Sequence, residues 1–96
     1  MVKAIDLIEL IDQRALEEYR SQVSETVESY KGSIKSRGSI RELFWNELGC
    51  APFSTIVELE FSHLENAHSW VVSREYQALV PIRNKAMKLT LFSIAT

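Results

Sequence analysis

The segment 54–61 limits the fold of this chain more than any other stretch, because its side chains alternate as those of a β-strand do. Val57, Leu59 and Phe61 point to one side of an extended strand. The opposite side mixes Ile56 with two glutamates. This pattern predicts a strand with one buried face and one partly polar face.

The strand leads directly into residues 60–83, which carry a helix start, a break and a second helical segment. Ser62 and Glu65 have the spacing of a capping box, so we expect a helix to begin there. Ser73 is expected to begin a new helical turn, and Pro81 is expected to end or kink the helix that follows.

The N-terminal part repeats this strand-to-helix order. Residues 2–11 mix β-branched and charged residues and predict a strand, after which Asp12 is a suitable N-cap. Apolar and aromatic residues then recur every three or four positions, which predicts a helix with one buried face: Leu16, Tyr19, Val23, Val27 and Tyr30. Gly32 can end this helix in the left-handed conformation.

Two further strands complete the prediction. Residues 33–38 form a weak strand between a helix stop and a turn, and residues 86–94 alternate as a final strand. Residues 40–48 hold an apolar cluster that suits either a hairpin arm or a loop packed on the sheet. The order β-α-β-β-α-β predicts a ferredoxin-like α+β domain over residues 1–96, with a four-stranded antiparallel sheet.

In this arrangement both helices cover one face of the sheet, and no segment remains to cover the other. The uncovered face carries isoleucine, leucine, valine and phenylalanine at alternating positions, which is too apolar for water. We therefore expect a homodimer in which two sheets meet face to face, as in a dimeric α+β barrel.

Composition excludes several classes of partner. The formal net charge is -2, and Lys and Arg are dispersed, which argues against a nucleic-acid or membrane partner. The single Cys50 favours a cytoplasmic location. No cofactor motif is present. His63 and His68 lie five residues apart and do not share a helix face, so no metal site is expected.

Three groups of residues resemble a known family. The largest runs from Glu60-Phe61 through Trp70, Ser73 and Glu75-Tyr76-Gln77-Ala78-Leu79 to Pro81 and Arg83; the others are Glu18-Tyr19-Arg20, and Tyr30, Gly32 and Arg37-Gly38. The chain thereby resembles the uncharacterised domain-of-unknown-function family 1330, a bacterial group of dimeric α+β barrels. It departs from the family pattern at Lys31, at Ser39 and in a longer segment 40–53. The resemblance implies the fold and no activity.

The candidate ligand-binding residues combine aromatic side chains with charged and hydroxyl groups: Tyr19, Arg37, Glu60, Trp70, Ser73, Tyr76 and Arg83. The arginines can present forked donors to an anion, or Arg37 can form a cross-strand ion pair with Glu58 or Glu60. Trp70 suits either a pocket wall or a core anchor whose indole donates to a carbonyl.

Three functions are compatible with this pattern. The first is a homodimer that binds a small anionic or aromatic metabolite between helices and sheet. The second is a cofactor-free enzyme in which Glu60 or a tyrosine transfers a proton. The third is a structural dimer without a ligand. A buried carboxylate beside an open cavity would favour the second, and complete pairing of buried polar groups would favour the third.

Overall fold

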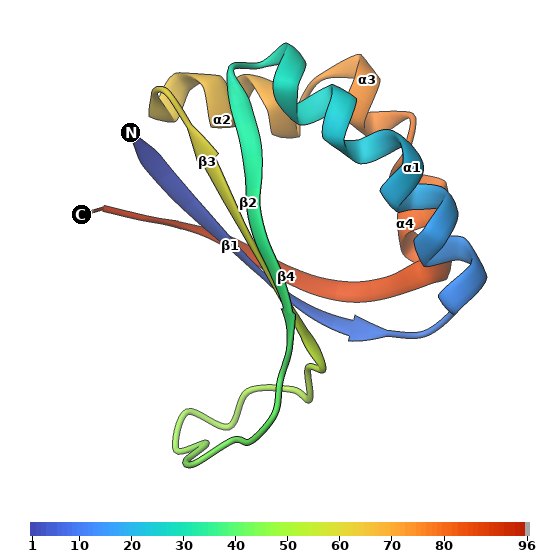
Figure 1. Ribbon diagram of the computed structural model, residues 1–96, viewed down its shortest axis with the longest axis vertical. Helices are drawn as coiled ribbons and strands as arrows, with labels where there is room; N and C mark the ends of the chain where they lie inside the picture. The colour runs from blue at the N-terminus through green and yellow to red at the C-terminus, as the bar shows by residue number, and fades with distance from the viewer. Residues whose placement is uncertain (96) are drawn as a thin grey trace.

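The computed structural model describes residues 1–95 and shows strands and helices in the predicted order (Figure 1). In chain order the elements are β1 (Val2–Leu10), α1 (Gln13–Ser29), β2 (Gly32–Ser39), β3 (Thr55–Phe61), α2 (Leu64–Val71), α3 (Arg74–Gln77), α4 (Val80–Ala86) and β4 (Met87–Ile94). The second predicted helical region is divided into three short helices.

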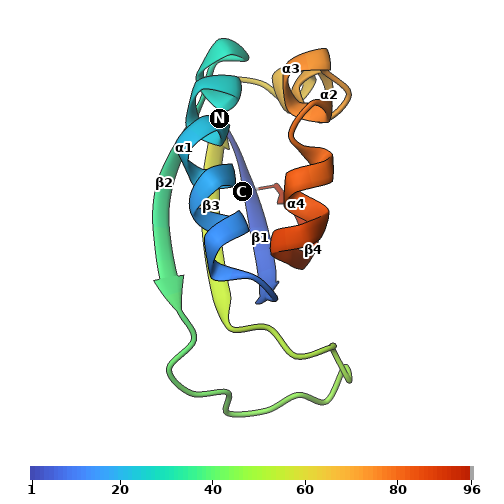
Figure 2. The ribbon, with the colours of Figure 1, turned by 90° about the vertical axis from the view of Figure 1, so that its right-hand side faces the viewer.

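The four strands form one antiparallel sheet in the order β2-β3-β1-β4. All helices lie on the same face of the sheet, with α1 and α4 packed side by side (Figure 2). This is the ferredoxin-like βαββαβ arrangement, and it confirms the predicted fold class.

The core lies between the helices and the covered face of the sheet. Val57, Leu59 and Phe61 are buried there, as the alternation in β3 predicts. The apolar stripe of α1 packs on them, and Val27 is completely buried. Asp12 caps α1 as expected, because its Oδ1 accepts from the backbone N–H groups of Arg14 and Ala15 at 2.9 and 3.1 Å.

Close packing around Gly32 leaves no room for a side chain at this position. The left-handed conformation predicted for Gly32 is wrong. The left-handed residue at the end of α1 is Lys31, with φ of 60°, and Gly32 begins β2. A Cβ atom at Gly32 would lie 2.6 Å from ring carbons of Phe61 and 2.8 Å from Cγ1 of Val27. The missing side chain thus lets the strand pass close to the core.

Two predicted helix signals are wrong in position. The N-cap of α2 is His63, whose backbone N–H donates to Oδ1 of Asn66 at 3.0 Å, whereas the Ser62 hydroxyl donates to the carbonyl of Lys31. Pro81 lies in the first turn of α4 and does not end a helix. A proline in a first turn loses no intrahelical hydrogen bond, which explains why it is accommodated there.

The loop 40–54 between β2 and β3 extends away from the body of the molecule (Figure 1). The loop contains no strand, so it is not a hairpin arm. Its apolar cluster does not pack on the sheet either, because Trp45 is 79% exposed and Leu48 is 93% exposed. Its return segment lies on the uncovered side of the sheet, where Cys50 and Pro52 line a hollow together with Leu7 and Lys88.

The chain leaves the second face of the sheet uncovered within residues 1–95. Phe92 and Ile94 are exposed on it, and Lys3 forms a surface ion pair with Glu58 at 3.9 Å.

None of the helices described is long and apolar enough to cross a membrane.

Candidate functional site

A hollow opens between α1 and the covered face of the sheet, and we call it the α1 hollow. It measures about 390 Å³ including the part open to solvent, but its enclosed part holds no more than about two water molecules, so it is a narrow cleft. Its lining is largely apolar with four polar exceptions: Asp6, Tyr19, Arg20 and Arg37, beside Ile8, Leu16, Val23, Ile34, Val57, Leu59, Trp70 and Met87.

Asp6 is the most unusual group in the lining. It lies on the central strand β1, only 9% exposed, between Val57 and Leu91 of the neighbouring strands. Its Oδ1 is buried and has no hydrogen-bond partner within residues 1–95. Burial raises the pKa of this carboxyl from 3.8 to about 6, and the charge of Arg83 opposes part of that rise.

Near Asp6, two tyrosine hydroxyls and an arginine guanidinium are joined by hydrogen bonds. The hydroxyls of Tyr19 and Tyr76 lie 3.0 Å apart, and Nη1 of Arg83 donates to the Tyr76 oxygen at 2.9 Å. Burial, together with the neighbouring Tyr76, raises the pKa of Tyr19 far above its usual range. Tyr19 therefore stays neutral at physiological pH and acts as a hydrogen-bond donor or acceptor.

The hydroxyl pair leaves one hydrogen unused. Tyr19 and Tyr76 each carry one hydroxyl hydrogen, but their contact requires only one, and Arg83 supplies its own. One phenolic hydrogen therefore has no acceptor among the hydrogen bonds of residues 1–95. When Tyr76 donates to Tyr19, the unused hydrogen is that of Tyr19, which lines the α1 hollow together with the unpaired acceptor on Asp6.

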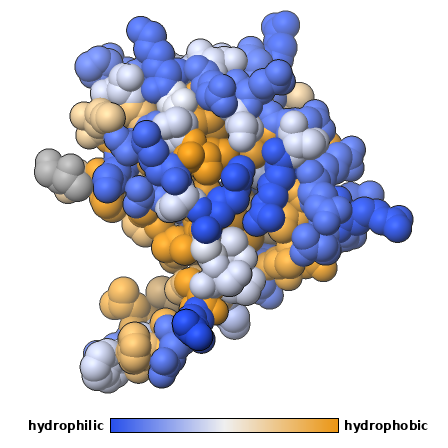
Figure 3. All heavy atoms as spheres, in the orientation of Figure 1, coloured by the Kyte–Doolittle hydropathy of each residue, from blue (hydrophilic) through white to orange (hydrophobic). Residues whose placement is uncertain are grey.

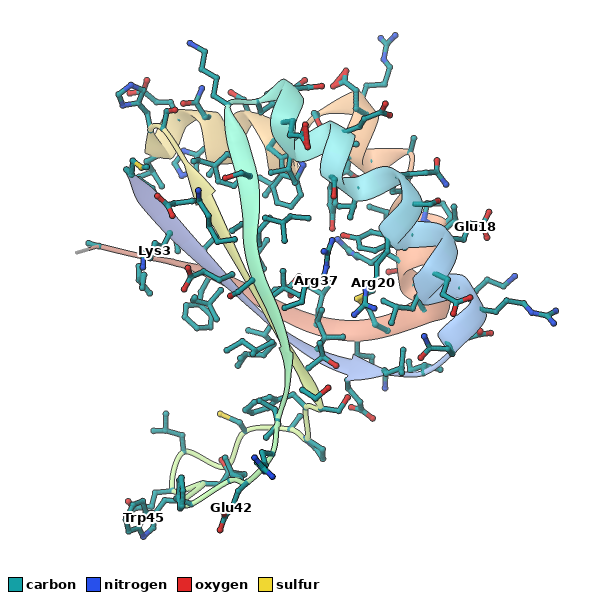
Figure 4. All side chains as sticks on the ribbon, viewed as in Figure 1. Lys3, Glu18, Arg20, Arg37, Glu42 and Trp45 are labelled. Atoms are coloured by element: carbon teal, nitrogen blue, oxygen red, sulfur yellow. The ribbon has the colours of Figure 1, made fainter. Side chains whose placement is uncertain are left out.

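Arg20 and Arg37 stand at the entrance of the α1 hollow. Arg20 comes from α1 and Arg37 from β2, and both extend into the space between helix and sheet (Figure 4). Apolar surface is visible between hydrophilic side chains in the middle of this face (Figure 3). Two guanidinium groups beside an apolar cleft form an arrangement suited to a ligand with an anionic end.

Trp70 has both of the roles predicted from the sequence, as a core anchor and as a wall of a pocket. It is 3% exposed, and its ring packs on Phe61 and Tyr76 with centroid distances of 5.6 and 4.3 Å. Its Nε1 donates to the Thr26 hydroxyl at 3.0 Å, where a carbonyl was expected. Trp70 is thus a core anchor that also forms part of the lining of the α1 hollow.

The structure brings together five of the predicted site residues, places a sixth beside them as a helix cap, and separates the seventh. Tyr19, Arg37 and Trp70 line the α1 hollow, and Tyr76 and Arg83 support Tyr19. Ser73 is buried as the N-cap of α3, where its hydroxyl accepts from the N–H of Tyr76 at 3.0 Å. Glu60 lies on the uncovered face of the sheet, away from this group.

The alternative ion pair of Arg37 is not formed. The register places Arg37 opposite Val57 on the helix-covered face, whereas Glu58 and Glu60 alternate to the other face. Glu58 instead contacts Lys3. Arg37 therefore keeps its guanidinium available at the entrance of the α1 hollow.

Sequence reasoning missed Asp6 and Arg20 as site residues. Asp6 could have been identified from the alternation of β1, because its side chain lies on the same face of the strand as the buried Ala4 and Ile8. The side chains of Lys3 and Glu9 lie on the opposite face. Arg20 directly follows Tyr19 on α1, but nothing in helix periodicity distinguishes an arginine beside a cleft from a solvated one.

In the described part of the chain, no group of three His, Cys, Asp or Glu side chains could hold a metal ion.

The fold and this site define an α+β protein of the ferredoxin-like class with a cleft between helix and sheet. The chain belongs to the family described as "Domain of unknown function (DUF1330)", whose model matches residues 4–96. Among curated proteins, none matches the sequence.

Solved structures share the fold at low sequence identity. A protein of unknown function from Rhodopseudomonas palustris superposes with a TM-score of 0.80 at 12% identity, over 99% of this chain and 81% of that one. SnoaB, described as a cofactor-independent oxygenase from Streptomyces nogalater, gives 0.68 at 6% identity, over 99% and 91%. A dimeric ferredoxin-like protein of unknown function from Thermobifida fusca gives 0.61 at 10% identity, over 99% and 90%.

Proposed function

We propose that this chain is a small-molecule-binding protein that holds a flat, anionic ligand in the α1 hollow. The observation that carries this proposal is the convergence of two arginines at the entrance with an unpaired buried carboxylate oxygen inside, on Asp6. Buried polar groups in proteins are nearly always hydrogen-bonded, so an unpaired one beside an opening favours a ligand site.

The lining indicates how such a ligand would lie. Its anionic end meets the guanidinium groups of Arg20 and Arg37, and its apolar body lies along Val57, Leu59 and Trp70. A hydroxyl or amino group at the inner end can donate to Asp6. Because the cleft is narrow, entry of the ligand requires movement of the two arginine side chains.

The ligand-free structural alternative is less well supported. A dimer without a ligand gives no reason to retain an unpaired carboxylate in a core, since a neutral apolar residue would cost less. Neither does it account for the two arginines at the entrance of an apolar cleft.

A thermal-shift titration with benzoate and benzamide tests the anion site. The two probes have nearly the same shape, but only benzoate is charged. We expect millimolar benzoate to raise the melting temperature of the wild type more than benzamide does. The difference should be lost in Arg37→Ala and Arg20→Ala and kept in the control Arg74→Ala, whose exposed residue is outside the lining. Equal responses to both probes would contradict an anion site.

We infer further that a second copy of the chain covers the open face of the sheet. Ile5, Leu7, Ile56 and Phe92 lie on that face, and the loop 40–54 bends toward the same side. The Thermobifida fusca protein of this fold is described as dimeric, which supports a dimer of this chain. Sedimentation at micromolar concentration tests this: a persistent monomer would contradict it.

A further inference from the structure

The polar groups of the α1 hollow have complementary chemical properties. Asp6 offers an unpaired carboxylate oxygen, the Tyr19–Tyr76 pair retains one unused hydroxyl hydrogen, and Arg20 and Arg37 carry fixed positive charge at the entrance. A base, a neutral donor and a cationic anchor are the parts needed to remove a proton next to a carbonyl group and to stabilise the resulting oxyanion.

We propose that Asp6 is a general base that tautomerises small 2-oxo acids between keto and enol forms in the α1 hollow. This inference depends on the proposed anion site and names its substrate class. The substrate carboxylate binds Arg20 and Arg37, and its carbonyl oxygen accepts the Tyr19 hydrogen, which is unused when Tyr76 donates to Tyr19. The adjacent carbon then faces Asp6.

The reaction is balanced without an oxidant or a cofactor. The Asp6 carboxylate takes one proton from the carbon beside the carbonyl, and the C–H electron pair becomes the C=C bond of the enolate. The former C=O π electrons move to the oxygen, where the tyrosine hydroxyl stabilises the charge. Solvent water protonates that oxygen to give the enol, while Asp6 releases the proton it took to solvent; the reverse steps exchange the carbon-bound hydrogen with solvent.

The surroundings of Asp6 suit a base that works near neutral pH. Burial raises its pKa to about 6, so the group is ionised at pH 7 yet more basic than an ordinary aspartate. Arg83 on α4 and Tyr19 on α1 lie close enough to Asp6 to act on it electrostatically. Arg20 on α1 and Arg37 on β2 share the lining of the α1 hollow, and Tyr76 on α3 contacts Tyr19 and Arg83. The raised pKa of Tyr19 excludes that hydroxyl as the base.

Hydrogen–deuterium exchange tests the proposal directly. Pyruvate and phenylpyruvate are incubated in D2O with the full chain, and loss of the C3 protons is followed by NMR, with binding titrated in the same samples. We expect saturable exchange above the buffer rate for at least one probe. Asp6→Asn should lower it about 100-fold or more while the probe still binds. Glu60→Gln removes a carboxylate from the opposite face and should leave the rate unchanged.

The pH profile separates Asp6 from solvent hydroxide. Exchange by Asp6 should rise between about pH 5 and 7 and then level off, because the base becomes fully ionised. Exchange by hydroxide should increase without a plateau. Tyr19→Phe should lower kcat more than it changes KM, which a purely structural role would not produce.

Two outcomes would overturn the inference in distinguishable ways. If a probe binds saturably but its exchange is absent or equal in wild type and Asp6→Asn, then Asp6 is not a base and the anion site remains. If neither probe binds, the proposed anion site fails together with the inference. The melting temperature of Asp6→Asn, measured alongside, shows that a lost rate does not come from unfolding.

Discussion

The hydroxyl oxygens of Tyr19 and Tyr76 lie 3.0 Å apart in the core and join α1 to α3. The Tyr76 oxygen also accepts from Arg83 at 2.9 Å, so one phenol connects three helices. The two rings meet edge to face with their centroids 6.5 Å apart. This contact fixes the position of Tyr19, which lines the same hollow as Asp6.

Tyr76→Phe should therefore lower the free energy of unfolding by about 1–3 kcal/mol, because it leaves the buried Tyr19 hydroxyl without its partner. The matched control is Tyr30→Phe. The Tyr30 hydroxyl donates to Glu75 at an exposed site, where water can replace the bond, so a smaller loss is expected. Urea unfolding measures both. Equal losses would show that the Tyr19–Tyr76 contact has no special energetic role.

Asp6 should make stability fall as pH rises. Its folded pKa of about 6 exceeds the ordinary value of 3.8, so the folded state binds more protons than the unfolded state between these values. The contribution is fully present below about pH 4 and is lost as pH rises through about 6, with a magnitude on the order of 3 kcal/mol.

Asp6→Asn should remove this pH-dependent component, since asparagine cannot ionise. At about pH 8 the variant is expected to be more stable than the wild type by a few kcal/mol at most, and near pH 4 the difference should disappear. Urea unfolding of both proteins across this range provides the measurement. A pH dependence that is the same in both proteins would show that Asp6 is not the titrating group.

Gly32→Ala should be strongly destabilising, because the added methyl group would lie 2.6 Å from Phe61 and 2.8 Å from Val27. Overpacking of this kind costs about 1–3 kcal/mol. Gly38 on the same strand is the control, since a Cβ atom there would meet only Ile56, at 3.9 Å. Thermal melts of both variants compare the two positions. A Gly32→Ala protein as stable as Gly38→Ala would contradict the close approach.

The order of the elements could be predicted from the sequence because it depends on local periodicity. The alternation in β3 and the apolar stripe of α1 each identify their own buried face. Pro81 could not be placed, because proline is compatible with the first turn of one helix as well as with the end of another.

The candidate site was only partly predictable for a physical reason. Tyr19, Trp70 and Tyr76 are large aromatic residues at helix positions, so their convergence on the core follows from burial alone. The role of Asp6 depends on which polar groups lie opposite it across α1, α3 and α4, and single-sequence periodicity does not contain that information. Glu60 was predicted instead as a possible cross-strand neighbour of Arg37, but its side chain alternates to the other face of the sheet.

The exposed loop 40–54 should contribute to association of two copies. Phe44 and Trp45 are 75% and 79% exposed, so they contribute little to the fold of one subunit, and a neighbouring copy would bury them. Phe44→Ser/Trp45→Ser should weaken the dimer at least about tenfold while the circular dichroism spectrum stays unchanged. Glu42→Ser/Glu47→Ser alters the same loop without removing apolar area and serves as the control. Sedimentation over a concentration series measures all three proteins, and an unchanged dimer constant in the aromatic variant would exclude the loop from the interface.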